Sequence, residues 1–109
     1  MRSTTPEIDV DQLEAGRSAA TVIDVREPGE YVAGHVPGAL LVPMGRLAAH
    51  AGELDGSRPV YVVCASGNRS AAMADLLVAR GFEAYSVAGG TAAWARSGRP
   101  VETGAPRAS

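Results

Sequence analysis

The sequence predicts an α/β domain in which a mostly parallel sheet carries helices on both faces. Short apolar runs rich in β-branched residues alternate along the chain with segments that carry helix-capping residues, and this alternation is typical of parallel sheets. Because the most strand-like runs are apolar almost throughout, we expect strands that are covered on both sides. A chain of 109 residues has room for one compact core. We therefore expect a single domain over residues 1–109, with its core over about 8–101 and a flexible tail over 102–109.

Capping residues and a β-branched run predict the first elements. Asp9 and Gln12 have the spacing of a capping box, which predicts a short helix that ends near Gly16. The run 21–25 is β-branched and almost entirely apolar, so it predicts a buried strand. Pro28 suits the first turn of the helix that follows.

The middle of the chain predicts two strands with a short helix between them. A Pro-Gly turn at residues 37–38 precedes a short strand over 40–42, and a brief helix is expected over 45–51. The run 60–63 is the most strand-like segment of the whole chain.

The last third of the chain predicts a long helix, a strand and a short helix. Ser70 is expected to cap a helix over 71–80. A strand over 84–87, a glycine turn at 89–90 and a helix over 91–96 follow. The expected inner face of the long helix consists of Met73, Leu76, Leu77 and Ala79.

Charge and composition exclude several classes of function. The net charge is −2 without a run of like charges, so the sequence has no electrostatic footprint for nucleic acid or for an acidic membrane surface. No apolar run is long enough to cross a bilayer, and the first residues lack the apolar core of a secretory signal, so we expect a cytoplasmic protein. The single cysteine agrees with a reducing compartment. All ten basic residues are arginine, which excludes catalysis by lysine.

Cys64 is the candidate nucleophile. It follows the strand 60–63, and parallel sheets place their ligand sites at the carboxyl ends of strands. Gly67 lets the next residues curl, so that the amides of residues 65–70 can surround the sulfur with the start of a helix behind them. The thiolate is the reactive form of cysteine, and such a ring of N–H groups predicts a lowered pKa without a histidine base.

The polar residues next to Cys64 distinguish it from a cysteine with a purely structural role. Taken singly, Cys64 would be a small buried hydrophobe, Arg69 a solvated surface charge and Ser70 a helix cap. Together in one loop, the arginine charge and the hydroxyls of Ser66 and Ser70 suit a site that binds an anion beside a thiol.

Other candidate residues have structural interpretations. Asp24, at the end of a strand, is expected to accept hydrogen bonds from loop amides or to pair with an arginine. His35 is expected to bond to the backbone of a turn, and Trp94 to close the core. His35, His50 and Cys64 lack the close spacing of a zinc site, so we expect no metal.

Four segments, in their order along the chain, resemble the characteristic motifs of single-domain rhodanese-like sulfurtransferases. They are Asp24–Glu27 with Glu30 and Tyr31, Gly34–Ala39, Cys64–Ser70, and Gly89–Trp94. The resemblance extends over about Ile8–Val101, and the combination is more specific than any single motif. It implies a three-layer α/β/α domain around a five-stranded, mainly parallel sheet.

The same resemblance implies a reaction and a set of site residues. Cys64 would carry a persulfide, taking sulfane sulfur from thiosulfate or a persulfide donor and passing it to cyanide, a thiol or a protein acceptor. The residues expected to bind the anionic donor are Ala65, Ser66, Gly67, Asn68, Arg69 and Ser70. Asp24 and Arg26 would support the site, and no cofactor is implied.

Two other functions remain open at this stage. Cysteine phosphatases and arsenate reductases also use a loop from cysteine to arginine, but theirs is one residue longer than the four residues between Cys64 and Arg69. The shorter loop favours a single sulfur atom over a tetrahedral phosphate. A sulfur carrier or sensing module for one dedicated partner would keep the same fold and loop.

Overall fold

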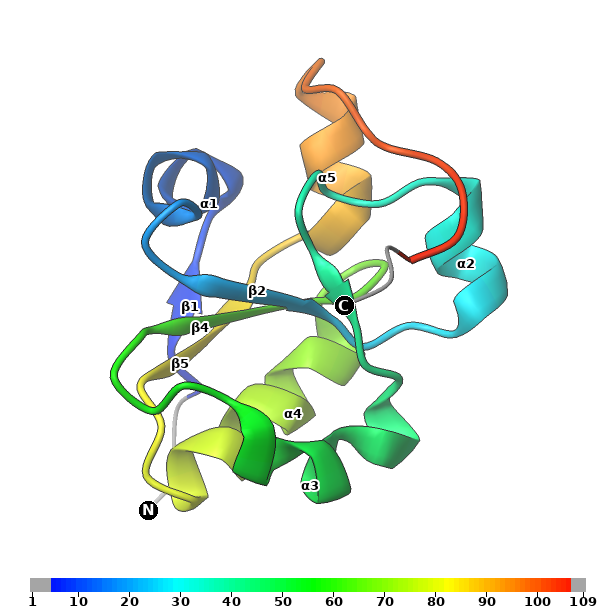
Figure 1. Ribbon diagram of the computed structural model, residues 1–109. Helices are drawn as coiled ribbons and strands as arrows, with labels where there is room; N and C mark the ends of the chain where they lie inside the picture. Colours follow the sequence, from blue (N-terminus) through cyan, green and yellow to red (C-terminus); the bar gives the residue numbers. More distant parts are fainter. Residues whose placement is uncertain (1–4, 107–109) are drawn as a thin grey trace.

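Five parallel strands form the centre of the molecule in the computed structural model, which describes residues 5–106 (Figure 1). The sheet has the order β1-β5-β4-β2-β3, and every neighbouring pair is parallel. The strands are β1 (Glu7–Ile8), β2 (Thr21–Asp24), β3 (Leu40–Leu41), β4 (Val60–Val63) and β5 (Ala84–Val87). The parallel sheet expected from the sequence is therefore confirmed, and β4, the most apolar run, lies at its centre.

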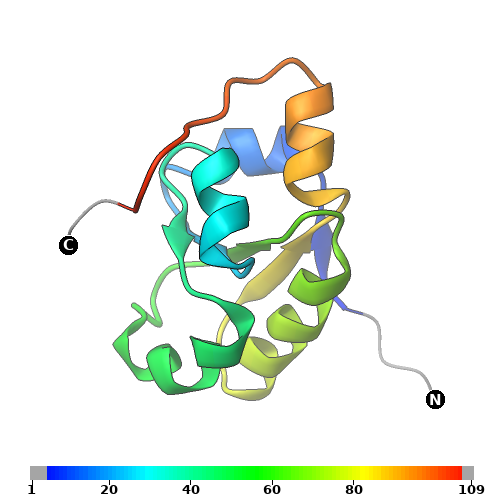
Figure 2. The same ribbon diagram turned by 90° about the vertical axis from the view of Figure 1, so that its right-hand side faces the viewer.

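Helices cover both faces of this sheet and complete a three-layer α/β/α arrangement (Figures 1 and 2). One face carries α1 (Val10–Gly16), α2 (Pro28–Ala33) and α5 (Gly90–Arg96), and the other carries α3 (Leu47–His50) and α4 (Asn68–Ala79). Short 3-10 turns over Met44–Arg46 and Ala51–Glu53 flank α3. The capping box predicted at the start of α1 is present, with Gln12 N–H donating to Asp9 over 2.8 Å.

Two apolar cores lie between these layers because successive strand residues point to opposite faces of the sheet. Ile23, Val62 and Ala84 face α4, where Ala74 and Leu77 are fully buried. The alternate strand residues Val22, Val63 and Val87 form the other core with Leu13 of α1 and Trp94 of α5. Trp94 thus closes the core as expected, and a side chain's layer follows from whether its position in the strand is odd or even.

The start of α4 differs from the prediction. The helix begins at Asn68, and its N-cap is Gly67 rather than Ser70. Ser70 instead lies in the first turn with its side chain buried. The buried face consists of Ser70, Ala74 and Leu77 at helical spacing, whereas Ala79 lies on the far side and is exposed. Residues 73 and 76 are partly buried at the edge of the core, as expected for the inner side.

Two segments show more structure than the sequence predicts. The edge strand β1 has only two residues, too few for a hydrophobic pattern. In the segment 102–106, where the sequence predicts a flexible tail, Glu102 exchanges two main-chain hydrogen bonds with His35 and Gly104 N–H donates to Val32 O over 2.9 Å. These bonds use only peptide groups, so the side-chain composition of the segment does not predict them. Residues 107–109 of the expected tail lie outside the described residues.

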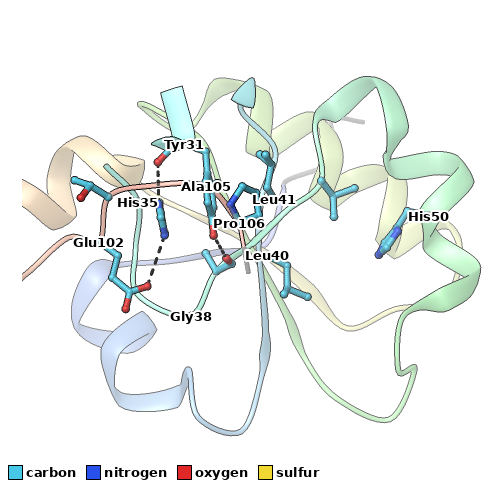
Figure 3. Close-up of a pocket in the computed structure, with 12 residues that line it drawn as sticks. Tyr31, His35, Gly38, Leu40, Leu41, His50, Glu102, Ala105 and Pro106 are labelled. Atoms are coloured by element: carbon cyan, nitrogen blue, oxygen red, sulfur yellow. Dashed lines mark hydrogen bonds and ion pairs between the residues drawn. The ribbon is translucent and has the colours of Figure 1, made fainter. Parts of the chain in front are cut away.

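A cavity of about 610 Å³ lies beside α2, between β3 and the segment 102–106 (Figure 3). His35 is buried on one wall, with its ring stacked 3.6 Å from that of Tyr31 and its Nδ1 2.8 Å from the Tyr31 main-chain oxygen. This is the backbone contact expected of a turn histidine. Of the described residues that line the cavity, none belongs to the loop 64–70, so the cavity is separate from the thiol.

No helix formed by residues 5–106 combines the length and apolar character that a membrane span needs.

Candidate active site

The loop 64–70 leaves the carboxyl end of the central strand β4, and its last three residues form the start of α4 (Figure 1). Cys64 is its first residue and is 1% exposed. Asp24 ends the neighbouring strand β2 and pairs in register with Val63, so it lies beside the start of the loop. The parallel sheet thus brings the predicted nucleophile and the predicted supporting carboxylate to the same edge.

Several polar groups converge on the sulfur of Cys64. The main-chain N–H groups of Gly67 and Ser70 donate to Sγ over 3.0 and 3.3 Å, and the Ser70 hydroxyl oxygen lies 3.4 Å from it. Gly67 has φ +112°, in the left-handed region that glycine enters without strain. The positive end of the α4 dipole also faces the sulfur. The loop therefore stabilises a negative charge on Sγ.

The carbonyl groups of the same loop are bound by the first turn of α5. Thr91 N–H donates to Cys64 O over 2.8 Å, and Ala92 N–H donates to Ala65 O over 3.1 Å. Gly90, with φ +58°, makes this approach possible, because a Cβ atom there would collide with the carbonyl oxygen of Cys64. The glycine turn predicted from the sequence therefore fixes the direction of the peptide groups around the thiol.

Hydrogen bonding sets the pKa of the Cys64 thiol. Burial raises this pKa, but hydrogen bonds from the Ser70 hydroxyl and from the N–H groups of Ser70, Gly67 and Ser66 outweigh burial. The pKa of Cys64 consequently lies below its ordinary value. The groups that lower this pKa are thus one hydroxyl and main-chain N–H groups of the loop.

Arg69 forms an ion pair that sequence reasoning did not anticipate. Its two terminal nitrogens donate to the two carboxylate oxygens of Glu30, on α2, over 2.8 and 2.9 Å. Hydrogen bonding from Arg69 lowers the pKa of Glu30 to about 2, and Glu30 in turn raises the pKa of Arg69. Cys64 contributes to the raised pKa of Arg69 as well, after the larger contributions of Glu30. In this structure the arginine thus meets a carboxylate where the sequence analysis expects a donor anion.

Asp24 and Arg26 form a second, buried ion pair. Arg26 Nη2 lies 2.8 Å from Asp24 Oδ2, and their side chains are 7% and 0% exposed. Arg26 Nη2 also donates to Gly34 O over 2.7 Å, and Arg26 N–H donates to Asp24 Oδ1 over 3.0 Å. Asp24 therefore accepts a loop amide and pairs with an arginine, the two possibilities considered from the sequence. The pair joins the end of β2 to the end of α2, the helix that carries Glu30.

The remaining predicted loop residues contribute through their main chains. Ser66 supplies an N–H group to the sulfur, Ala65 supplies a carbonyl group to α5, and Asn68 is the first residue of α4. Ser86, on β5, is a site residue that sequence reasoning missed, with its Oγ 2.7 Å from Ser70 Oγ. Within residues 5–106, no three His, Cys, Asp or Glu side chains come together in a way that suits a metal ion.

Comparison with known families decides the relationship of this chain. The model of the rhodanese-like domain matches residues 9–97, from the cap of α1 to the end of α5. This chain belongs to the rhodanese-like family. The resemblance inferred from the four sequence motifs is therefore confirmed, as is the α/β/α fold that it implies.

Solved structures superpose on most of this rhodanese-like domain. A rhodanese-related protein from Thermoplasma volcanium is 34% identical with a TM-score of 0.85, and the match covers 89% of this chain and 97% of that one. A rhodanese-like domain protein from Staphylococcus aureus is 32% identical with a TM-score of 0.79, covering 90% and 97%. A thiosulfate sulfurtransferase from Pseudomonas aeruginosa is 30% identical with a TM-score of 0.83, but the match covers 94% of this chain and 21% of that protein.

Replacing Gly90 by alanine should destabilise the domain by more than about 2 kcal/mol, because it combines a strained φ with a collision against the Cys64 carbonyl. Gly29→Ala is the matched control, since Gly29 lies in α2 and no atom approaches the position of its Cβ within 4 Å. The control should be neutral or stabilising by up to about 1 kcal/mol. Urea unfolding of both variants measures the difference, and equal free energies of unfolding would contradict this account of the loop.

Alkylation of Cys64 should report a thiol pKa below the ordinary value of a free cysteine. Only the thiolate reacts, so the rate with iodoacetamide should rise with pH and reach its plateau at a lower pH in the folded protein than in urea. The position of the plateau is the measurement, because burial of Cys64 also lowers the absolute rate. A folded-state profile that coincides with the unfolded one, or lies at higher pH, would refute the expectation.

Proposed function

We propose that this rhodanese-like domain transfers sulfane sulfur through a persulfide on Cys64. The observation that carries the proposal is the convergence of the Gly67 and Ser70 N–H groups on Sγ at the start of α4. This arrangement stabilises a thiolate, the nucleophile of the reaction, without a general base. The family match and the likeness to a thiosulfate sulfurtransferase support the same class of chemistry.

The proposed reaction has two steps. The Cys64 thiolate attacks the outer sulfur of thiosulfate or of a persulfide, the S–S bond of the donor breaks, and sulfite or a thiolate leaves with the bonding electrons. Cyanide, a thiol or a protein acceptor then attacks the terminal sulfur of the Cys64 persulfide and restores the thiolate. Each step exchanges one sulfur atom between two nucleophiles, so the chemistry requires no cofactor. The free and persulfide forms are both anions, which suits a loop whose stabilising groups are N–H donors.

The Arg69–Glu30 pair bears on the choice of donor. Glu30 has a pKa of about 2, so it is ionised and offsets the arginine charge throughout the neutral pH range. Attraction of an anionic donor then depends on the N–H groups of the loop and on the part of the Arg69 positive charge that Glu30 does not neutralise. We therefore propose that thiosulfate is accepted, with Glu30 weakening its binding, and that a donor with less charge is affected less.

One structural observation favours an alternative function, that of a sulfur carrier for a dedicated partner. Cys64 is 1% exposed, which suits a thiol that exchanges sulfur with a partner able to reach into the loop rather than with any solute. The carrier and the free enzyme share the first step. They differ in turnover, because a carrier gains one sulfur from thiosulfate and does not pass it to cyanide at a useful rate.

Intact-mass measurement tests the proposed function directly. After incubation with thiosulfate and removal of the excess, the protein should be heavier by one sulfur atom, and cyanide should remove that atom with formation of thiocyanate. Cys64→Ser is the control and should gain nothing. Sulfur uptake without release to cyanide would favour the carrier. If the parent hydrolysed an aryl phosphate, Cys64→Ser did not, and neither took up sulfur, the protein would be a phosphatase and the proposal would be wrong.

Opposite changes in KM are expected from the two members of the Arg69–Glu30 pair. Arg69→Ala should raise the KM for thiosulfate about tenfold, the loss of roughly one charge-assisted hydrogen bond. Glu30→Gln should lower the KM roughly threefold, because an ion pair this open to solvent is worth about 0.2–1 kcal/mol and both of its side chains are only half-buried. Steady-state kinetics measure both effects, and the free energy of unfolding should change by less than about 1 kcal/mol. Unchanged KM values in both variants would show that Arg69 does not contact the donor.

A further inference from the structure

Ser86 places a hydroxyl group in the apolar layer between β5 and α4. It is fully buried and points to the same face of the sheet as Ala84, where the neighbouring side chains belong to the α4 core. A hydroxyl in such surroundings is costly unless it is hydrogen-bonded. Ser86 Oγ lies 2.7 Å from Ser70 Oγ, which brings together two serines that are 16 residues apart in the sequence.

The direction of this hydrogen bond follows from counting protons. Ser86 has one hydroxyl proton, and among residues 5–106 the acceptor found for it is Ser70 Oγ. Ser70 has other acceptors within reach, namely Gly67 O at 3.1 Å and the sulfur of Cys64 at 3.4 Å. If Ser70 donated to Ser86, the Ser86 proton would be left buried and unpaired. Ser86 therefore donates, and the Ser70 proton is free to turn toward the loop.

The protonation state of Cys64 then decides where the Ser70 proton points. In the thiol form, the S–H group donates to Ser70 Oγ, and Ser70 donates to Gly67 O. After ionisation the sulfur is an acceptor only, so the Ser70 hydroxyl turns its proton from Gly67 O to Sγ. Ser86 donates to Ser70 Oγ in both forms, and this donation strengthens the hydrogen bond that Ser70 makes to the thiolate.

We propose that Ser86 is a positioning residue for the nucleophile, acting through Ser70 by directing the Ser70 hydroxyl toward the sulfur of Cys64. This role deepens the proposed function and rests on it in one respect, that the Cys64 thiolate is the reacting group. Within residues 5–106 the side-chain hydrogen bond of Ser86 goes to Ser70 rather than to the sulfur, so its effect passes through that single hydrogen bond. The ionisation of Cys64 is therefore the property that Ser86 controls.

The experiment compares the apparent pKa of Cys64, from the pH profile of iodoacetamide alkylation, in four proteins. They are the parent, Ser86→Ala, Ser70→Ala and the double variant. Ser86→Ala should raise the pKa by about half a unit to one unit, the size of one ordinary hydrogen bond. In the Ser70→Ala background the same substitution should leave the pKa unchanged, because the group through which Ser86 acts has been removed.

A merely structural role would give a different pattern. An unchanged pKa in Ser86→Ala, or a shift of equal size with and without Ser70, would overturn the proposal. Should Ser86→Ala fail to fold, Ser86→Thr and Ser86→Val form a second pair of nearly equal volume that differ in the hydroxyl group. Threonine should then keep a lower Cys64 pKa than valine, and equal values would refute the role. Alkylation needs no sulfur donor, so a failure of sulfur transfer is distinguished from a failure of this inference.

Discussion

The N-termini of α4 and α5 together determine how the peptide groups of the loop 64–70 are oriented. The rest of the site depends on this orientation. The first turn of α5 binds the carbonyl oxygens of Cys64 and Ala65, and the start of α4 directs N–H groups at the sulfur. One peptide group belongs to both sets, because Ala65 O accepts from α5 while the N–H group of the same peptide, that of Ser66, is directed at the sulfur. Gly67 and Gly90 adopt positive φ at the points where the chain enters these two arrangements. The glycine-containing motifs thus determine the electrostatic environment of the Cys64 sulfur as well as the turns of the chain.

The stabilisation of the thiolate comes from neutral dipoles more than from side-chain charges. Arg26 is paired with Asp24, and Arg69 is paired with Glu30, so both arginines near the loop have a carboxylate partner. The N–H groups and the Ser70 hydroxyl remain to offset the effect of burial on the sulfur. In the proposed reaction, a site of this kind would retain its stabilising groups when the anion changes from a thiolate to a persulfide, because main-chain donors do not titrate. The charge near the loop can then be changed mainly through the ion pair of Arg69 and Glu30.

Local patterns predicted most of the fold and failed where a pattern was too short or used only peptide groups. The apolar runs of β2, β4 and β5 and the capping box of α1 were sufficient to place those elements. The two-residue strand β1 and the bridge between His35 and Glu102 carry no side-chain signal. At the start of α4, the sequence predicts Ser70 as the cap, but Gly67, in the left-handed conformation, is the N-cap and the Ser70 side chain points inward. Here the hydrogen bonds of the sulfur override the usual preference of serine for a helix cap.

The sequence by itself indicated the candidate nucleophile and the groups that surround it, because Cys64, Gly67 and Ser70 lie within one short loop after a buried strand. It also determined the layers of the fold and, through four motifs, the family. Only the tertiary structure decided that Glu30 forms an ion pair with Arg69 and that Ser86 forms a hydrogen bond with Ser70. These partners are separated by 39 and 16 residues along the chain. Their meeting depends on the packing of α2 and β5 against the loop, which no local spacing of residues encodes.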